Sequence, residues 1–276
     1  LWHSSAKDNA PTTVLTLDAS AAPDSSSEAQ VVEVPTVSGN SLRHQCVREP
    51  GWHGLAEALG LEPGLPGAGK IPPGVEALFS NGGNIQAGVK APSNQHRLAQ
   101  DIRAAYPLLD LLGGVTNTFD LGASRLQVAG WVVCREHRDS IGAAADLPAA
   151  SVSIFDLVDD ITHTRQATRD GLGQMILSFE ALCPGTQVLV RFLLDDYTQP
   201  LTHGAFVAAV ERYIQSGPIV GGQRARGFGA MRAEWFGITP ESHWAEGYAT
   251  YISENRERLL DGLVTGRLCT ETVVCT

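Results

Sequence analysis

A glycine- and arginine-rich segment carries the residue types best suited to bind an anion. The segment Gly217–Phe236 contains four glycines that can form a tight loop, at positions 221, 222, 227 and 229. Arg224, Arg226 and Arg232 are interspersed among them. Such a loop can expose backbone N–H groups, against which a phosphate chain can lie. The segment predicts a polyanion-binding loop, and an ordinary turn with solvated arginines is the alternative.

A second candidate is a helix start that bears basic side chains. Asn40 or Ser41 can N-cap a helix that continues Leu-Arg-His-Gln-Cys-Val-Arg. At helical spacing His44 and Arg48 share one face. A helix N-terminus beside a basic side chain is a natural phosphate site. A solvated basic face is the alternative interpretation.

A third candidate is a polar, β-branched segment from Phe155 to Gly171, which predicts a projecting hairpin. His163, Arg165 and Arg169 occupy roughly alternate positions there and can lie on one side of an extended strand. The next residues alternate between apolar and polar from Met175 to Ala181, and a nearly continuous apolar run follows from Gln187 to Leu194. Both runs are typical of strands.

Composition limits how the chain could bind nucleic acid. The 276 residues are 43% hydrophobic, enough for a substantial core, and the formal net charge is −10. That charge argues against binding through bulk electrostatics, so a nucleic-acid site must be local. Five cysteines without a C-x-x-C pair fit reduced thiols in a cytoplasm rather than disulfides or zinc. No apolar run reaches membrane-spanning length, and we expect a cytoplasmic protein with no membrane partner.

One apparent nucleotide-binding motif fails in its context. Gly64–Lys70 satisfies G-x-x-x-x-G-K. The next residues are Ile71-Pro72-Pro73 instead of Ser or Thr opening a helix, and Pro72 disfavours helical geometry at Ile71. We therefore do not expect a phosphate loop here.

The order of the expected elements is compatible with a βαββαβ layout. Helical spacing predicts a helix over 94–112, with a kink at Pro107 and a stop at Gly113. Residues 136–150 are expected to form a loop. The other expected elements are strands at 31–37, 126–135 and 230–236, and helices at 41–48, 204–215 and about 239–264.

Several segments resemble one family, the repeat-associated (RAMP) proteins of CRISPR systems. Val37–Arg43 is similar to their Ser-Leu-Arg helix start, and Gly221–Gly229 to their glycine-rich loop. Asp160–Arg169 resembles the thumb hairpin of the Cas-seven-like backbone subunits. Tyr106–Gly114 together with Gly122–Val133 looks like the insertion of type IV backbone subunits. The resemblance spans about residues 31–236.

The resemblance implies an α+β fold with a ferredoxin-like (RRM-like) core, a long helical insertion and a projecting β-hairpin thumb. One elaborated domain would then cover residues 1–276. Its core would comprise about 31–60, 124–135 and 172–236, its insertion about 61–123, its thumb about 151–172, and its C-terminal helix about 239–264.

The implied function is that of a non-catalytic subunit that binds CRISPR RNA and polymerises head to tail along the guide. Further effector subunits and target nucleic acid would be partners, without cofactor or metal. The expected RNA-binding residues, from the resemblance and the basic faces together, are Ser41, Arg43, His44, Arg48, His163, Arg165, Arg169, Gly221, Gly222, Arg224, Arg226 and Gly227. The remaining expected thumb residues are Ile161, Thr162, Thr164 and Gln166.

An enzymatic alternative stays open. Some type III relatives cut target RNA with an acidic residue in the loop after the first strand. The equivalent residues 4–30 offer Asp8, Asp18 and Asp24, which could position a metal in a ribonuclease. Acidic residues in a loop are also ordinary, and we expect no catalysis.

Overall fold

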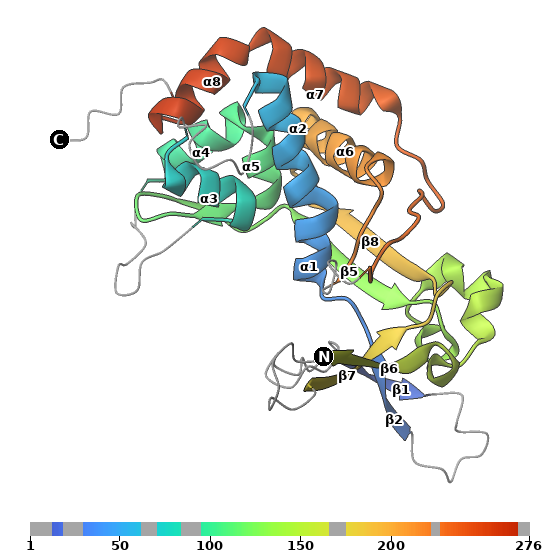
Figure 1. The fold of residues 1–276 in the computed structure, drawn as a ribbon. Helices are drawn as coiled ribbons and strands as arrows, with labels where there is room; N and C mark the ends of the chain where they lie inside the picture. Colours follow the sequence, from blue (N-terminus) through green and yellow to red (C-terminus); the bar gives the residue numbers. More distant parts are fainter. Residues whose placement is uncertain are drawn as a thin grey trace, which may run out of the picture. The chain divides into compact units, whose positions relative to one another are not determined.

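The computed structural model describes residues 13–18, 30–61, 71–83, 95–165, 175–221 and 227–269 (Figure 1). They form a mixed α+β structure, as expected. The chain divides into two compact units. Unit 1 comprises Leu1–Ser38 and Ala129–Arg191, and unit 2 comprises Gly39–Val128 and Phe192–Thr276. The single domain expected over residues 1–276 stays a prediction. Within the described ranges, every helix is too short or too polar to cross a bilayer.

The described strands pair in four two-stranded sheets. The pairs are β1 (Thr13–Asp18) with β2 (Gln30–Pro35), β3 (Gly114–Val115) with β4 (Asp120–Gly122), β5 (Leu126–Val132) with β8 (Val188–Leu194), and β6 (Val158–Arg165) with β7 (Met175–Leu182). The expected continuous ferredoxin-like sheet is not seen among these residues and stays a prediction.

Unit 1 is built around the antiparallel pair β6–β7, in register from Val158 opposite Leu182 to Arg165 opposite Met175. The pairing therefore joins residues 158–165 with 175–182 and extends beyond the segment expected at 155–171. The residues expected as a loop at 136–150 instead form short 3-10 turns over 135–137, 142–146 and 148–151, followed by another at 154–156. These turns bury Ile141, Ala144 and Ala150 against Val133, so the segment folds because its alanines pack.

Two adjacent titratable residues are buried in unit 1. Although burial raises the pKa of Glu136, hydrogen bonds from the Ile154 N–H (2.9 Å) and the Ser153 hydroxyl (2.9 Å), with the charge of Arg135, lower it overall. Burial also lowers the pKa of His137, against the opposing effects of Val132 and Glu136. The neutral His137 donates from Nδ1 to the Val132 carbonyl at 3.0 Å. Nε2 of His137 has no partner within the described ranges.

Acidification should therefore destabilise unit 1. In the unfolded chain His137 takes up a proton near pH 6.5, whereas in the folded chain it does so only at lower pH. The contribution of neutral His137 to the free energy of unfolding is therefore lost as the pH falls below about 6.5. The Glu136 contribution, present above about pH 4.3, is lost at still lower pH. We expect the urea midpoint to fall between about pH 7 and pH 5, and His137→Gln to flatten that dependence. The exposed control His53→Gln should leave it unchanged; an equally steep dependence in both variants would contradict this assignment.

Unit 2 begins with one long helical stretch. Helix α1 (Gly39–Arg43) continues through a π-helical turn (His44–Arg48) into α2 (Glu49–Leu59). The expected helix at 41–48 is confirmed but extends through Pro50 and Gly51 to Leu59. A proline inside a helix crowds the carbonyl four residues earlier. The wider π turn directly before α2 relaxes this crowding, so the helix passes Pro50 without ending.

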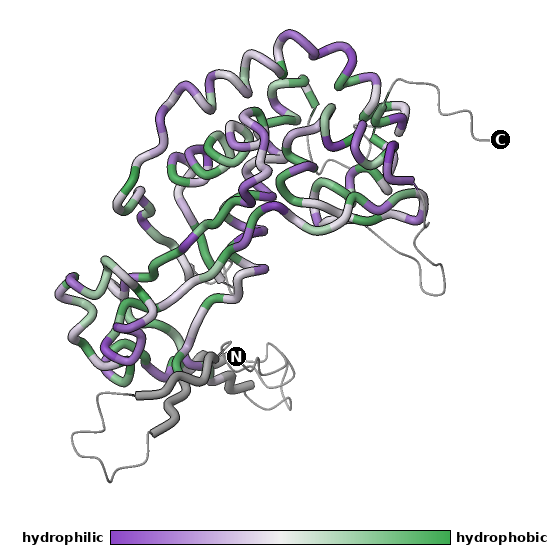
Figure 2. The backbone as a smooth tube through the Cα atoms, turned by 180° about the vertical axis from the view of Figure 1, so that it is seen from behind, coloured by the Kyte–Doolittle hydropathy of each residue, from purple (hydrophilic) through white to green (hydrophobic). Residues whose placement is uncertain are grey.

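The remaining helices of unit 2 pack as a bundle. They are α3 (Pro73–Asn81), α4 (His96–Ala105), α5 (Pro107–Leu112), α6 (Pro200–Gln215), α7 (Ser242–Glu254) and α8 (Arg256–Thr265). Helix α6 packs on α2, α5 and α7 (Figure 1). Trp52 stacks on Phe79 with ring centroids 4.8 Å apart, which fastens α3 onto α2. Purple hydrophilic stretches recur along α7 and α8, as expected of amphipathic helices that cover a core (Figure 2).

The helix expected at 94–112 is confirmed, with its break at Pro107 and its end at Gly113. Two other expectations for unit 2 are wrong. The strand expected at 230–236 is reduced to an isolated bridge between Ile219 and Ala230. The single C-terminal helix is interrupted at Asn255, which leaves helical geometry between α7 and α8. Helix α3 was not expected, because Pro72 and Pro73 suggest a break; Pro73 is instead the first residue of the helix.

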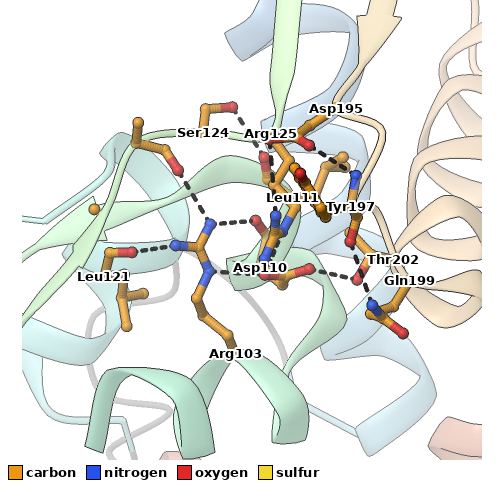
Figure 3. Close-up of polar contacts among 12 residues, drawn as sticks. Arg103, Asp110, Leu111, Leu121, Ser124, Arg125, Asp195, Tyr197, Gln199 and Thr202 are labelled. Atoms are coloured by element: carbon orange, nitrogen blue, oxygen red, sulfur yellow. Dashed lines mark hydrogen bonds and ion pairs between the residues drawn. The ribbon is translucent and has the colours of Figure 1, made fainter. Parts of the chain in front are cut away.

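A buried carboxylate joins several elements of unit 2 (Figure 3). Asp110 on α5 is 4% exposed. Its Oδ1 accepts from Nε of Arg103 at 2.7 Å and from Nε of Arg125 at 2.8 Å, and its Oδ2 accepts from the Thr202 hydroxyl at 2.8 Å. Arg103 also donates to the carbonyls of Leu121 and Ala123. The carboxylate therefore links α4, α5, the start of β5 and α6.

We expect Asp110→Asn to lower the free energy of unfolding by about 3–5 kcal/mol, because it removes the counter-charge of Arg103 and leaves Arg125 with only the longer ion pair to Asp195 at 3.8 Å. Urea titration followed by circular dichroism measures the change. Asp196→Asn, an exposed carboxylate with no described ion pair, is the matched control and should change the free energy by less than about 0.5 kcal/mol. Equal effects of the two substitutions would contradict the role assigned to Asp110.

Candidate nucleic-acid interface

The structure brings the expected helix start and the glycine-rich loop together through Gln45. The Gly221 N–H donates to Oε1 of Gln45 at 3.2 Å. Nε2 of Gln45 donates to the Ser41 hydroxyl at 3.2 Å. Ser41 and Gly221, 180 positions apart in the sequence, are thus connected by one side chain. Sequence reasoning missed Gln45; its position four residues after Ser41, on the same helix face, is the signal that could have found it.

The start of α1 lies directly against β5. A Cβ on Gly39 would overlap the carbonyl oxygen of Val128, so only glycine allows this approach. Arg43 is half-buried and donates from Nη2 to Oδ1 of Asn40 at 3.0 Å. Among the described residues, no carboxylate lies within ion-pair distance of Arg43. The neighbouring His44 is exposed.

Arg48 does not share an exposed face with His44, contrary to expectation. It is 6% exposed, and its Nη1 donates to the carbonyls of Leu78 at 3.1 Å and Phe79 at 3.5 Å. Burial, with the nearby charge of Arg43, lowers the pKa of Arg48 to about 10. The C-terminal turn of α3 covers Arg48, and its guanidinium satisfies the carbonyls at that helix end. Arg48 is thus placed to hold α3 rather than to meet a ligand.

The two glycines at the described edges of the loop have left-handed backbones. Gly221 has φ 86° and Gly227 has φ 84°, and each would have open space around a Cβ. These conformations explain why glycine occupies both positions. Gly222, Arg224 and Arg226 lie outside the described residues, as do Gly64–Lys70 of the apparent nucleotide motif.

The expected thumb residues belong to unit 1. Ile161 and Thr162 lie in β6, and the Thr162 and Ser178 hydroxyls are 3.1 Å apart across the β6–β7 pair. His163, Thr164 and Arg165 continue the backbone of β6, whereas Gln166 and Arg169 lie outside the described residues. Of the expected acidic residues, Asp18 ends β1, and Asp8 and Asp24 lie outside the described part.

Within the described ranges, no three His, Cys, Asp or Glu side chains group so as to hold a metal ion. Comparison with protein-family models finds no match, and comparison with curated proteins finds none either.

Gly39→Ala should disturb the candidate interface. The added methyl group must push α1 away from β5, and overpacking of this kind costs about 1–3 kcal/mol of unfolding free energy. The matched control is Gly247→Ala on α7, where nothing lies within 4 Å of the new Cβ. That control should stabilise the chain by about 0.5–1 kcal/mol, because alanine favours helix over glycine. Thermal unfolding of both variants measures the difference, and destabilisation by both would contradict the assignment.

Proposed function

We propose that this chain is a CRISPR RNA-binding backbone subunit. Copies would associate head to tail along a guide RNA within a multi-subunit effector complex, each with a ferredoxin-like core and a β6–β7 thumb. The subunit would present the guide for pairing and perform no catalysis itself.

The observation that carries this proposal is the hydrogen bond between Gly221 and Gln45. It supports a groove with the start of α1 on one side and the glycine-rich loop on the other. Exposed backbone at glycines and the guanidinium of Arg43, which has no ion pair with the described carboxylates, suit phosphate and ribose oxygens. Contacts of this kind fix the register of a strand without reading its bases. The bases then stay free to pair with a target, as in RNA-guided recognition generally.

Charge reversal at the two sides of this groove should weaken RNA binding. We expect Arg43→Glu, and separately Arg224→Glu with Arg226→Glu, to lower the affinity for single-stranded RNA by roughly tenfold or more. The double substitution of Arg224 and Arg226 removes two phosphate contacts and should also reduce the slope of log affinity against log salt by about 1.4. Filter binding across a salt series measures both quantities.

Arg138→Glu is the matched control, since Arg138 is exposed in unit 1 and is not part of the proposed groove. The proposal requires that this variant bind RNA nearly as well as the unmodified chain. Equal weakening by all three variants would indicate binding through general charge alone.

The assembly itself can be tested by co-expression with a CRISPR array and the partner subunits. We expect recovery of a complex that contains several copies of the chain and a small RNA of defined length. Recovery of an RNA-free monomer would overturn the proposal. Incubation of the complex with labelled complementary RNA and Mg²⁺ tests the non-catalytic role, because regularly spaced cuts abolished by Asp8→Ala or Asp18→Ala would assign a ribonuclease instead.

A further inference from the structure

A second basic site lies in unit 2, on the side of α4 that faces α8. A pocket of about 360 Å³ opens there, lined by Arg97 of α4, Arg258 of α8 and Arg267 just beyond α8. One carboxylate, Asp101, lines the same pocket. Three cationic side chains and one anionic side chain line the pocket, in a chain whose formal net charge is −10. Positive charge is locally concentrated against the overall balance.

The guanidinium of Arg258 is held in place by neutral partners. Its Nη2 donates to the Tyr251 hydroxyl at 3.0 Å and to Oδ1 of Asn255 at 2.9 Å. In the described part of the chain, no carboxylate lies within ion-pair distance of Arg258 or Arg267. Because a guanidinium has five N–H donors and these bonds use one nitrogen, Nε and Nη1 of Arg258 keep donors for a ligand.

The elements that carry these arginines are fastened together beneath the pocket. Tyr106 is 2% exposed and donates from its hydroxyl to the Leu259 carbonyl at 3.0 Å. The Tyr251 hydroxyl donates to the Ala105 carbonyl at 2.8 Å. A Cβ on Gly262 would overlap the Tyr106 hydroxyl, so glycine allows α8 to approach this closely. The arginines are therefore presented from fixed backbones, which lowers the entropic cost of binding.

We propose that this pocket binds the phosphate group of a phosphorylated ligand. Planar guanidinium groups match the paired oxygens of phosphate, and several of them suit a multiply charged anion better than a single carboxylate. The volume lies within the range of small-molecule sites, so the pocket has room for more than a lone ion. It shares no residue with the groove of Gln45 and Gly221 and is additional to the proposed RNA-backbone contacts.

Isothermal titration of the full chain with pyrophosphate tests the site. We expect saturable binding that Arg258→Gln with Arg267→Gln weakens by roughly tenfold or more. The matched control removes two exposed arginines of unit 1, Arg138→Gln with Arg191→Gln, and should bind pyrophosphate within about twofold of the unmodified chain. Absence of binding, or equal weakening by both pairs, would overturn the proposal.

For Asp101→Asn we expect tighter pyrophosphate binding, the opposite of the effect of the arginine substitutions. A folding defect would not produce this result. Loss of the negative charge of Asp101 should tighten pyrophosphate binding several-fold, because a like charge no longer faces the anion. Weaker binding in this variant would contradict the site. Competition by a nucleoside monophosphate, and by short RNAs with and without a 5′-phosphate, distinguishes a free metabolite from an RNA end as the phosphate source. Since pyrophosphate binding does not require the RNA groove, this result is independent of the proposed function.

Discussion

Unit 2 depends on the buried carboxylate of Asp110. An ionised group at such a position is costly unless charge and hydrogen bonds surround it. Here two arginines and one threonine supply them, from α4, the start of β5 and α6. Residues that are distant in the sequence therefore have to meet at one point. Hydrophobic burial alone is non-directional, whereas this ionic contact specifies which elements become neighbours.

The position of the candidate groove follows from the same bundle. Helix α6 packs against α5, which carries Asp110, and against the π turn that contains Gln45. After α6 the chain continues to Gly221. Oε1 of Gln45 accepts a hydrogen bond from the N–H of Gly221. The helix start and Gly221, at the described edge of the glycine-rich segment, are thus held by packed helices, although Gly221 itself is exposed. This is the usual division between a rigid scaffold and a functional loop.

Local signals predicted local structure, and long-range partners were missed. Helices α4 and α5 follow from local sequence alone. The apolar spacing of residues 94–112 predicts a helix, and Pro107 and Gly113 predict its break and its end. Pro73 begins a helix instead of ending one, which depends on the bundle that receives α3. Residues 230–236 have the composition of a strand, but in the described structure they contribute only the isolated bridge between Ala230 and Ile219. The spacing from Ser41 could have indicated Gln45, but neither the burial of Arg48 nor the choice of Gly221 as the partner of Gln45 leaves a pattern in the nearby sequence.

The π turn at His44–Arg48 fixes the direction in which the start of α1 faces relative to α2. A π turn amounts to one residue added to an α-helix, and each residue turns an α-helix by about 100°. The direction in which Ser41 and Arg43 point relative to α2 is therefore set by counting residues within the helix. An insertion or deletion of one residue there would rotate a whole face of the helix. A surface loop, in contrast, would absorb the same change in length. For the segment from Gly39 to Leu59, residue number is itself part of the geometry of the candidate groove.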